Sequence, residues 1–177
     1  MKKTFFKWQI LGFVVSVLCG VLLHFLYEWT NESILVAPFT GVNESTWEHM
    51  KLLFIPMFTF AIVQSFFFRK YSDFWGVKFK GILLGVLLMP ILYYLYNGVI
   101  GKSSDWINIA IFVISAGAAY IYEYKLMYKE NKSVPNKKTS VILLIFIFGL
   151  FVLFTFMPLK LNIFLDQTTN TYGVEKA

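Results

Sequence analysis

The segment TSVILLIFIFGLFVLFTFM, residues 139–157, decides the fold class of this chain. It holds no charged residue. A helix needs about 20 residues to cross a hydrocarbon layer about 30 Å thick, and this segment is close to that length. A backbone in lipid satisfies its own hydrogen bonds only as a helix or a closed barrel, and this segment lacks the alternation of a barrel strand. The segment therefore predicts a transmembrane α-helix.

Four further apolar segments precede it, at residues 10–27, 52–68, 81–100 and 106–122. The composition agrees, because 58% of the 177 residues are hydrophobic and only 15% are charged, whereas a soluble domain carries about 25% charged residues. We therefore predict an all-α, polytopic integral membrane protein with five transmembrane helices. Residues 1–158 would form one transmembrane domain, and residues 159–177 a C-terminal tail.

Basic residues predict how these helices are oriented, because lysine and arginine are retained in the cytoplasm during insertion. They gather in the N-terminal segment and in the second and fourth connections, on one side of a five-helix bundle: Lys2, Lys3, Lys7, Arg69, Lys70, Lys78, Lys80, Lys125, Lys129, Lys132, Lys137 and Lys138. The other side keeps few basic residues and an acidic first connection: Lys51, Lys102, Lys160, Lys176, Glu28, Glu32, Glu44 and Glu48. We predict a cytoplasmic N-terminus and an extracytoplasmic C-terminus. The net charge of +6 is explained by this insertion signal, so nucleic acid is not an expected partner.

Polar side chains gather in one extracytoplasmic stretch, GVNESTWEHMKLLFIP, residues 41–56. Ser45 and Glu48 have the spacing of a capping box at the start of the second helix. Glu48 in a first helical turn also suits the helix dipole. These rules do not explain His49, and they explain Glu44 and Lys51 poorly.

A second polar pair lies at the end of the first apolar segment, where His24 and Glu28 are four residues apart and share a helix face. An ionisable group at this depth normally faces protein or a water-filled cavity. The first connection is short, so the first two helices are expected to be antiparallel neighbours. We therefore expect His24 and Glu28 to meet Glu44, Glu48 and His49 in a shared site in the outer leaflet.

The tail PLKLNIFLDQTTNTYGVEKA, residues 158–177, has an apolar first half. We expect it to lie on the membrane surface or to fold back over the polar site, which would bring Asp166 and Tyr172 near it. The candidate ligand-binding residues are therefore His24, Glu28, Asn43, Glu44, Ser45, Trp47, Glu48, His49, Lys51 and Asp166.

Four uses of this site stay open. Its polar contacts could simply fix the helix hairpin and a partner contact, or they could bind a small molecule, a lipid headgroup or an ion. His24, Glu28, Glu44 and His49 are candidate metal ligands, although Cys19 is the only cysteine and no HExxH spacing occurs. A membrane-embedded hydrolase or transferase, metal-dependent or not, could use His49 or Glu48 as a general base. The sequence identifies no cofactor and no catalytic nucleophile, and a protein partner or a homo-oligomer stays open.

Three stretches carry a resemblance to a known family: LHFLYEW at 23–29, VNESTWEHMKLLFIP at 42–56 and FLDQTTNTYG at 164–173. The chain resembles a family of small bacterial integral membrane proteins of unknown function that share the signature Asn-Glu-Ser-x-Trp-Glu-His-x-Lys. Here the signature is formed by Asn43, Glu44, Ser45, Trp47, Glu48, His49 and Lys51. The resemblance implies a bacterial cell membrane and supports this cluster as the site, and it implies no activity.

Overall fold

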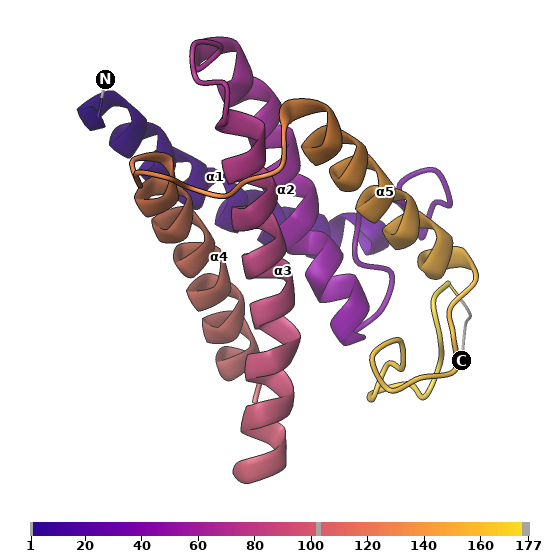
Figure 1. The fold of residues 1–177 in the computed structure, drawn as a ribbon. Helices are drawn as coiled ribbons and strands as arrows, with labels where there is room; N and C mark the ends of the chain where they lie inside the picture. Colours follow the sequence, from indigo (N-terminus) through magenta and orange to yellow (C-terminus); the bar gives the residue numbers. More distant parts are fainter. Residues whose placement is uncertain (1, 102–103, 175–177) are drawn as a thin grey trace.

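The computed structural model describes residues 2–101 and 104–174, and this part of the chain forms five α-helices (Figure 1). They are α1 (Lys2–Trp29), α2 (Thr46–Phe67), α3 (Phe74–Val99), α4 (Asp105–Met127) and α5 (Lys137–Phe156). All five are long and apolar enough to cross a membrane. The prediction of an all-α protein with five such helices is confirmed.

Two helices extend well beyond the apolar segments that predicted them. α1 begins at Lys2 and α3 at Phe74, each about two turns before its apolar segment. These turns stay helical because they are packed against other helices, with Phe5 0% and Phe74 2% exposed in one apolar cluster. Hydropathy marks the apolar middle of a helix, so it underestimates ends that tertiary contacts stabilise.

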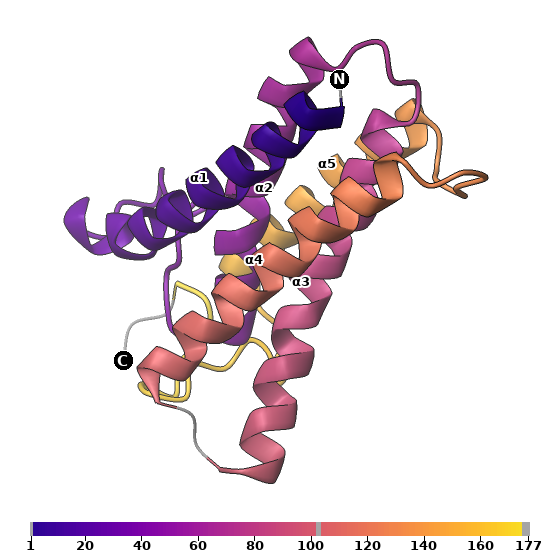
Figure 2. The same ribbon diagram turned by 90° about the vertical axis from the view of Figure 1, so that its left-hand side faces the viewer.

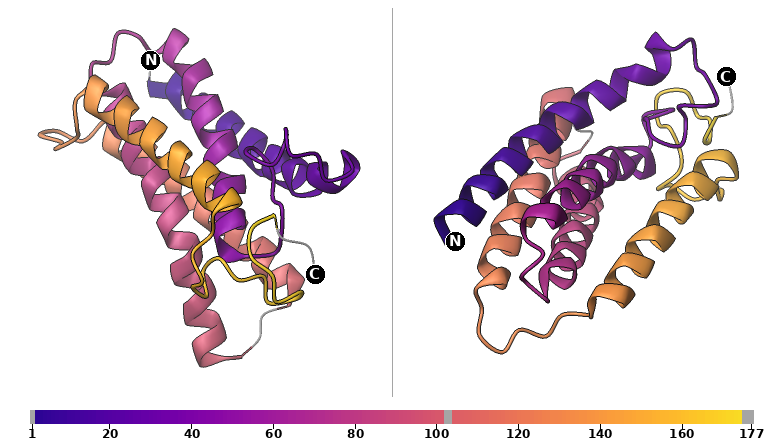
Figure 3. Two further views of the ribbon diagram at one scale, coloured as in Figure 1. Left: turned by 90° about the vertical axis from the view of Figure 1, so that its right-hand side faces the viewer. Right: turned by 90° about the horizontal axis from the view of Figure 1, so that it is seen from above.

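α2 is the central helix of the bundle. Seen from above, it lies between α1 and α5 (Figure 3), and it also packs against α3 and α4. In its most apolar window, 56% of the residues are buried, against 22% in α1, α3 and α5. α3 and α4 lie side by side and complete the bundle (Figure 2). The side chains of α2 therefore set the interior of the protein.

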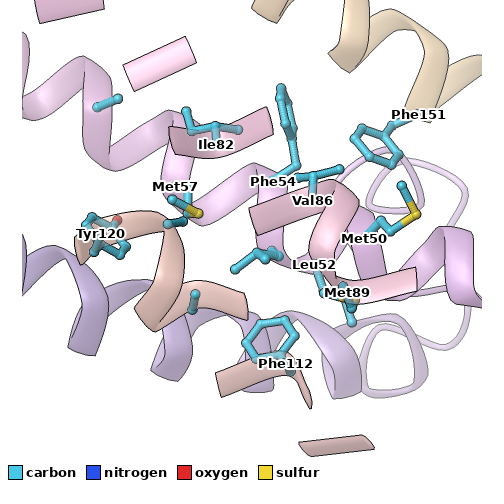
Figure 4. Packing of buried hydrophobic residues seen from close by; sticks show 14 of the residues in the cluster. Met50, Leu52, Phe54, Met57, Ile82, Val86, Met89, Phe112, Tyr120 and Phe151 are labelled. Atoms are coloured by element: carbon cyan, nitrogen blue, oxygen red, sulfur yellow. The ribbon is translucent and has the colours of Figure 1, made fainter. Parts of the chain in front are cut away.

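The main core is an apolar cluster built around α2. Leu53, Phe54 and Met57 of α2 are almost completely buried and belong to one cluster with Ile82 of α3 and Tyr120 of α4. Figure 4 shows this cluster from close by. Phe151 brings α5 into the same cluster. This apolar layer separates the polar residues near the two ends of α2.

The start of α2 lies at the end of the bundle where α1 and α5 finish, and residues 157–174 fold there without forming a helix (Figure 1). We call residues 157–174 the tail and this end of the bundle the tail end. The backbone N–H of Trp47 donates to the carbonyl oxygen of Ile163 at 2.9 Å. The ring of Trp47 packs on Phe164, which is 5% exposed. The tail thus folds back onto the first turn of α2, as its apolar first half suggested.

Candidate functional site

Two histidines and a glutamate from three segments meet at the tail end. His24 lies in the next-to-last turn of α1, Glu44 in the loop before α2, and His49 in the first turn of α2. The Nε2 atom of His24 is 3.4 Å from Oε1 of Glu44, and the Nε2 atom of His49 is 3.5 Å from Oε2 of Glu44. One ligand atom from each residue can be chosen so that all lie within 4.8 Å of one another. We call these residues the His24–Glu44–His49 cluster.

The cluster lies at the protein surface and is neither buried nor fully solvated. The side chains of His24 and His49 are 28% and 27% exposed, and that of Glu44 is 48% exposed. The planes of the two imidazole rings are tilted by 42°, with centroids 5.4 Å apart. The cluster is therefore open to its surroundings on one side.

The local sequence forms this geometry through a cap on α2. The side chain of Ser45 accepts the backbone N–H of Glu48 at 3.4 Å, which is the first half of the predicted capping box. The second half is replaced, because the backbone N–H of Ser45 donates to the side chain of Asn43 at 2.9 Å. This turn holds Glu44 immediately before the helix, with its carboxylate close to the ring of His49.

The cap also determines which ring nitrogen of His49 carries a proton. Its Nδ1 atom is 3.0 Å from the carbonyl oxygen of Ser45. A carbonyl oxygen only accepts hydrogen bonds, so Nδ1 donates, and in the neutral ring Nε2 carries a lone pair. That lone pair faces a carboxylate oxygen of Glu44, which is also an acceptor. A proton or a metal ion between these two acceptors would remove their mutual repulsion.

A family described as a family of unknown function (DUF6512) matches residues 1–174. The chain belongs to this family. The match covers the whole cluster and the tail. No curated protein matches this DUF6512 chain, and no solved structure matches it.

Beside the cluster, Glu48 and Lys51 form a second, fully buried polar group. Lys51 Nζ is 2.6 Å from Oε2 of Glu48, and the side chains are 0% and 2% exposed. The ammonium also donates to the hydroxyl of Thr155 and to the carbonyl oxygen of Ala37. The lysine thus joins α2 to α5 and to the loop after α1. Glu48 points into the bundle and away from the cluster, because adjacent helical residues diverge by about 100°.

The tail contributes directly to the loop that carries Glu44. The backbone N–H of Glu44 donates to Oδ2 of Asp166 at 3.2 Å, and Asp166 is 3% exposed. Burial alone would raise the pKa of Asp166, but hydrogen bonds from Thr168 and Glu44 outweigh it and hold that pKa below its usual range. Asp166 is therefore a buried carboxylate that is fully engaged as an acceptor.

The other predicted site residues take supporting positions. Glu28 is exposed one turn beyond His24 on α1. The side chain of Asn43 donates to the carbonyl oxygen of Gly173 at 2.9 Å. Trp47 packs against Phe151, Phe154 and Phe164. Tyr172 pairs with Leu165 within the tail. The structure thus brings His24, Glu44 and His49 together, surrounds them with Asn43, Ser45 and Asp166, and places Glu28 outside.

A polar network that the sequence analysis did not find lies near the other end of α2. Lys78 of α3 and Glu123 of α4 are 1% and 0% exposed, and Lys78 Nζ is 2.5 Å from Oε2 of Glu123. Gln9 of α1 donates to the same carboxylate at 2.7 Å, and Gln64 of α2 donates to Gln9. We call Gln9, Gln64, Lys78 and Glu123 the inner network. Its sequence signal is the presence of polar residues inside helices long enough to span a membrane.

Proposed function

We propose that this chain is a multi-pass protein of the bacterial cytoplasmic membrane, with the N-terminus in the cytoplasm and the tail end outside. The five apolar helices support the membrane location. The concentration of lysine and arginine at the end opposite the tail supports the orientation. The His24–Glu44–His49 cluster would then face the extracytoplasmic solution.

A labelling experiment tests this orientation. Single cysteines are introduced at Lys3 and Lys160 in a Cys19→Ser background and exposed to a membrane-impermeant maleimide in intact cells. We expect the cysteine at position 160 to react and the cysteine at position 3 to react only after cell lysis. The reverse pattern would overturn the orientation, and reaction of both in intact cells would argue against a membrane-spanning chain.

We infer further that the cluster binds a divalent transition-metal ion of the zinc class. The observation that carries this proposal is the spacing of the ligand atoms. In a tetrahedral zinc site with bond lengths of about 2.0–2.2 Å, neighbouring ligand atoms lie about 3.3–3.6 Å apart. His24 lies 3.4 Å from Oε1 of Glu44 and His49 lies 3.5 Å from Oε2, so each imidazole has one carboxylate oxygen at this spacing. When one oxygen of Glu44 is the ligand, the three ligand atoms all lie within 4.8 Å of one another, so the longest separation needs to close by about 1 Å to fit the same geometry.

Two features of the surroundings support a metal ion. Imidazole ligands of metals usually donate their second ring N–H to a carbonyl or carboxylate, and His49 has this partner in the carbonyl oxygen of Ser45. A metal ion would also separate the lone pair of His49 from the carboxylate of Glu44. Two histidines and one glutamate leave a fourth tetrahedral position for water.

The other uses of the cluster receive less support from the geometry. Two surface hollows of the protein are lined by Thr4 with residues 66–71 and by Lys80 with residues of α3 and Tyr122, and neither includes a cluster residue. A bulky organic ligand therefore has no preformed cavity among these. The carboxylate of Glu48 is paired with Lys51 and is not free to act as a general base. Ion binding is thus favoured over catalysis by Glu48.

Metal titration of the purified full-length protein in detergent tests the proposal. We expect one equivalent of Zn²⁺ to bind, and we expect His24→Ala and His49→Ala each to weaken binding by about 100-fold or more, beyond the 10–100-fold typical of outer-shell changes. Glu28→Gln is the matched control, because Glu28 is exposed one turn beyond His24 on the same helix and interacts with His24 only through its charge. The proposal fails if the wild type binds no zinc, or if Glu28→Gln weakens binding as much as the histidine variants.

A further inference from the structure

Glu44 is the one member of the cluster that no helix holds. His24 and His49 are fixed by α1 and α2, whereas Glu44 lies in the loop between Trp29 and Thr46. A metal site needs each ligand held close to its productive position. The question is therefore what fixes the backbone of Glu44.

The tail fixes it through Asp166. One carboxylate oxygen of Asp166 accepts the backbone N–H of Glu44 at 3.2 Å. The other accepts the backbone N–H and the hydroxyl of Thr168, at 2.7 and 2.6 Å. The backbone N–H of Asp166 donates to the carbonyl oxygen of Thr171 at 3.0 Å. Asp166 is thus held by its own turn and presents one oxygen to the loop.

Two more hydrogen bonds join the tail to the residues around Glu44. The side chain of Asn43 donates to the carbonyl oxygen of Gly173 at 2.9 Å. On the helix side, the backbone N–H of Trp47 donates to the carbonyl oxygen of Ile163 at 2.9 Å. Tail contacts therefore occur before Glu44, at Glu44 and after it.

The tail is also anchored to the helices independently of Glu44. Gly173 adopts φ +56°, and a side chain there would meet the carbonyl oxygen of Thr155 and the ring of Pro158. Phe164 is buried against Trp47 and Phe154. These contacts connect the tail, and with it Asp166, to α2 and α5. The position of Asp166 is therefore not set by the loop of Glu44 alone.

We propose that Asp166 is a positioning residue for the metal ligand Glu44, and that docking of the tail and binding of zinc are thermodynamically coupled. This inference rests on the proposed metal function. A docked tail holds Glu44 where its carboxylate reaches both histidines, so the docked state binds zinc more tightly. By linkage, zinc stabilises the docked tail by the same factor. The tail end thus presents a different surface when the metal is bound and when it is absent.

Zinc affinity of Asp166→Asn tests the positioning role. Asparagine keeps the shape of the side chain but replaces one acceptor oxygen by an amide donor, so either the Glu44 or the Thr168 contact is lost. We expect zinc binding to weaken about 10-fold, at the low end of the outer-shell range, while the metal-free variant keeps the helical content of the metal-free wild type in circular dichroism. Gln167→Ala is the matched control, because Gln167 is the exposed neighbour of Asp166. Its side chain accepts one long hydrogen bond, from the hydroxyl of Tyr93 at 3.4 Å.

Limited proteolysis of the wild type tests the coupling without any substitution. Lys160 is exposed at the base of the tail and provides a site for trypsin. We expect zinc to slow cleavage at Lys160 about 10-fold, and we expect a chelator to reverse this protection. If the wild type binds no zinc, the proposed function itself fails. If it binds zinc but Asp166→Asn binds equally well and zinc gives no protection, the coupling alone is wrong.

Discussion

Replacing Lys78 by methionine is expected to destabilise the protein by about 3–5 kcal/mol, the typical cost of removing one partner of a buried ion pair. The side chain of Glu123 is 0% exposed. Without Lys78 its carboxylate would be left charged and unpaired inside the bundle, or it would have to take up a proton. Unfolding by denaturant in detergent micelles, followed by circular dichroism, measures the change in the free energy of unfolding.

The inner network explains why one substitution has so large an effect. Lys78 Nζ contacts Oε2 of Glu123 at 2.5 Å and Oε1 of Gln9 at 3.2 Å. Gln9 donates in turn to Glu123, and Gln64 donates to Gln9. Four helices therefore meet at one charged pair, and water cannot replace the missing partner at a site that is fully buried.

Two further variants separate this explanation from a general loss of packing. Lys78→Met/Glu123→Met removes both charges and keeps two unbranched chains of similar volume, so it should recover most of the stability lost in the single variant. Lys125→Met is the control for removing a lysine, because Lys125 is exposed on α4, and it should change stability by less than about 0.5 kcal/mol. Equal destabilisation by the single and double variants would contradict the ion-pair explanation.

The sequence allowed the arrangement around His24 and His49 to be predicted, but not the identity of every group in it. A short connection between two apolar segments predicts antiparallel neighbours, and this is sufficient to bring the end of α1 close to the start of α2. Which of Glu44 and Glu48 joins the histidines depends on where the helix begins. The cap at Ser45 leaves Glu44 in the loop and turns Glu48 toward Lys51 and Thr155. The orientation of Glu48 thus involves a hydrogen bond from Thr155, which lies more than 100 positions further along the chain.

The inner network could not be predicted in the same way. Lys78 precedes the apolar segment at 81–100, so charge counting placed it in a solvated connection together with Lys80. The structure corrects this, because α3 already begins at Phe74 and Lys78 is 1% exposed. Its partner Glu123 lies 45 residues further along the chain. A single sequence contains no signal that pairs them.

The contribution of Asp166 required tertiary information as well. The apolar residues of the tail indicated a fold-back, which placed Asp166 in the correct region. Its role depends on backbone turns with positive φ at Asn170 and Gly173 and on the backbone N–H of Glu44. Backbone donors have no sequence signature, so contacts of this kind become visible only in a structure.

The second large effect on stability is expected from a substitution at Gly81, because the missing side chain there makes room for the carboxylate of Glu123. A Cβ atom added at Gly81 would lie 2.5 Å from Oε1 of Glu123 and would also overlap the stem of that side chain. Alanine is favoured over glycine in a helix by about 0.8–1.0 kcal/mol, so propensity alone predicts a gain in stability. The overlap opposes it by pushing Glu123 away from Lys78. We expect Gly81→Ala to destabilise the protein by about 2–3 kcal/mol in the same unfolding measurement, as overpacking of a filled core does.

Gly98→Ala is the matched control in the same helix, because a Cβ atom at Gly98 would meet nothing within 4 Å. It should leave stability unchanged or raise it by up to about 1 kcal/mol. A combined variant tests the cause, because the effects of two substitutions on the free energy of unfolding are non-additive for residues in contact and additive for independent sites. In a Lys78→Met/Glu123→Ala background the overlapping carboxylate is gone, so Gly81→Ala should lose its cost and behave like Gly98→Ala. If Gly81→Ala stays as harmful in that background, the close approach of Glu123 is not its cause, and the helix backbone around Gly81 must carry the effect.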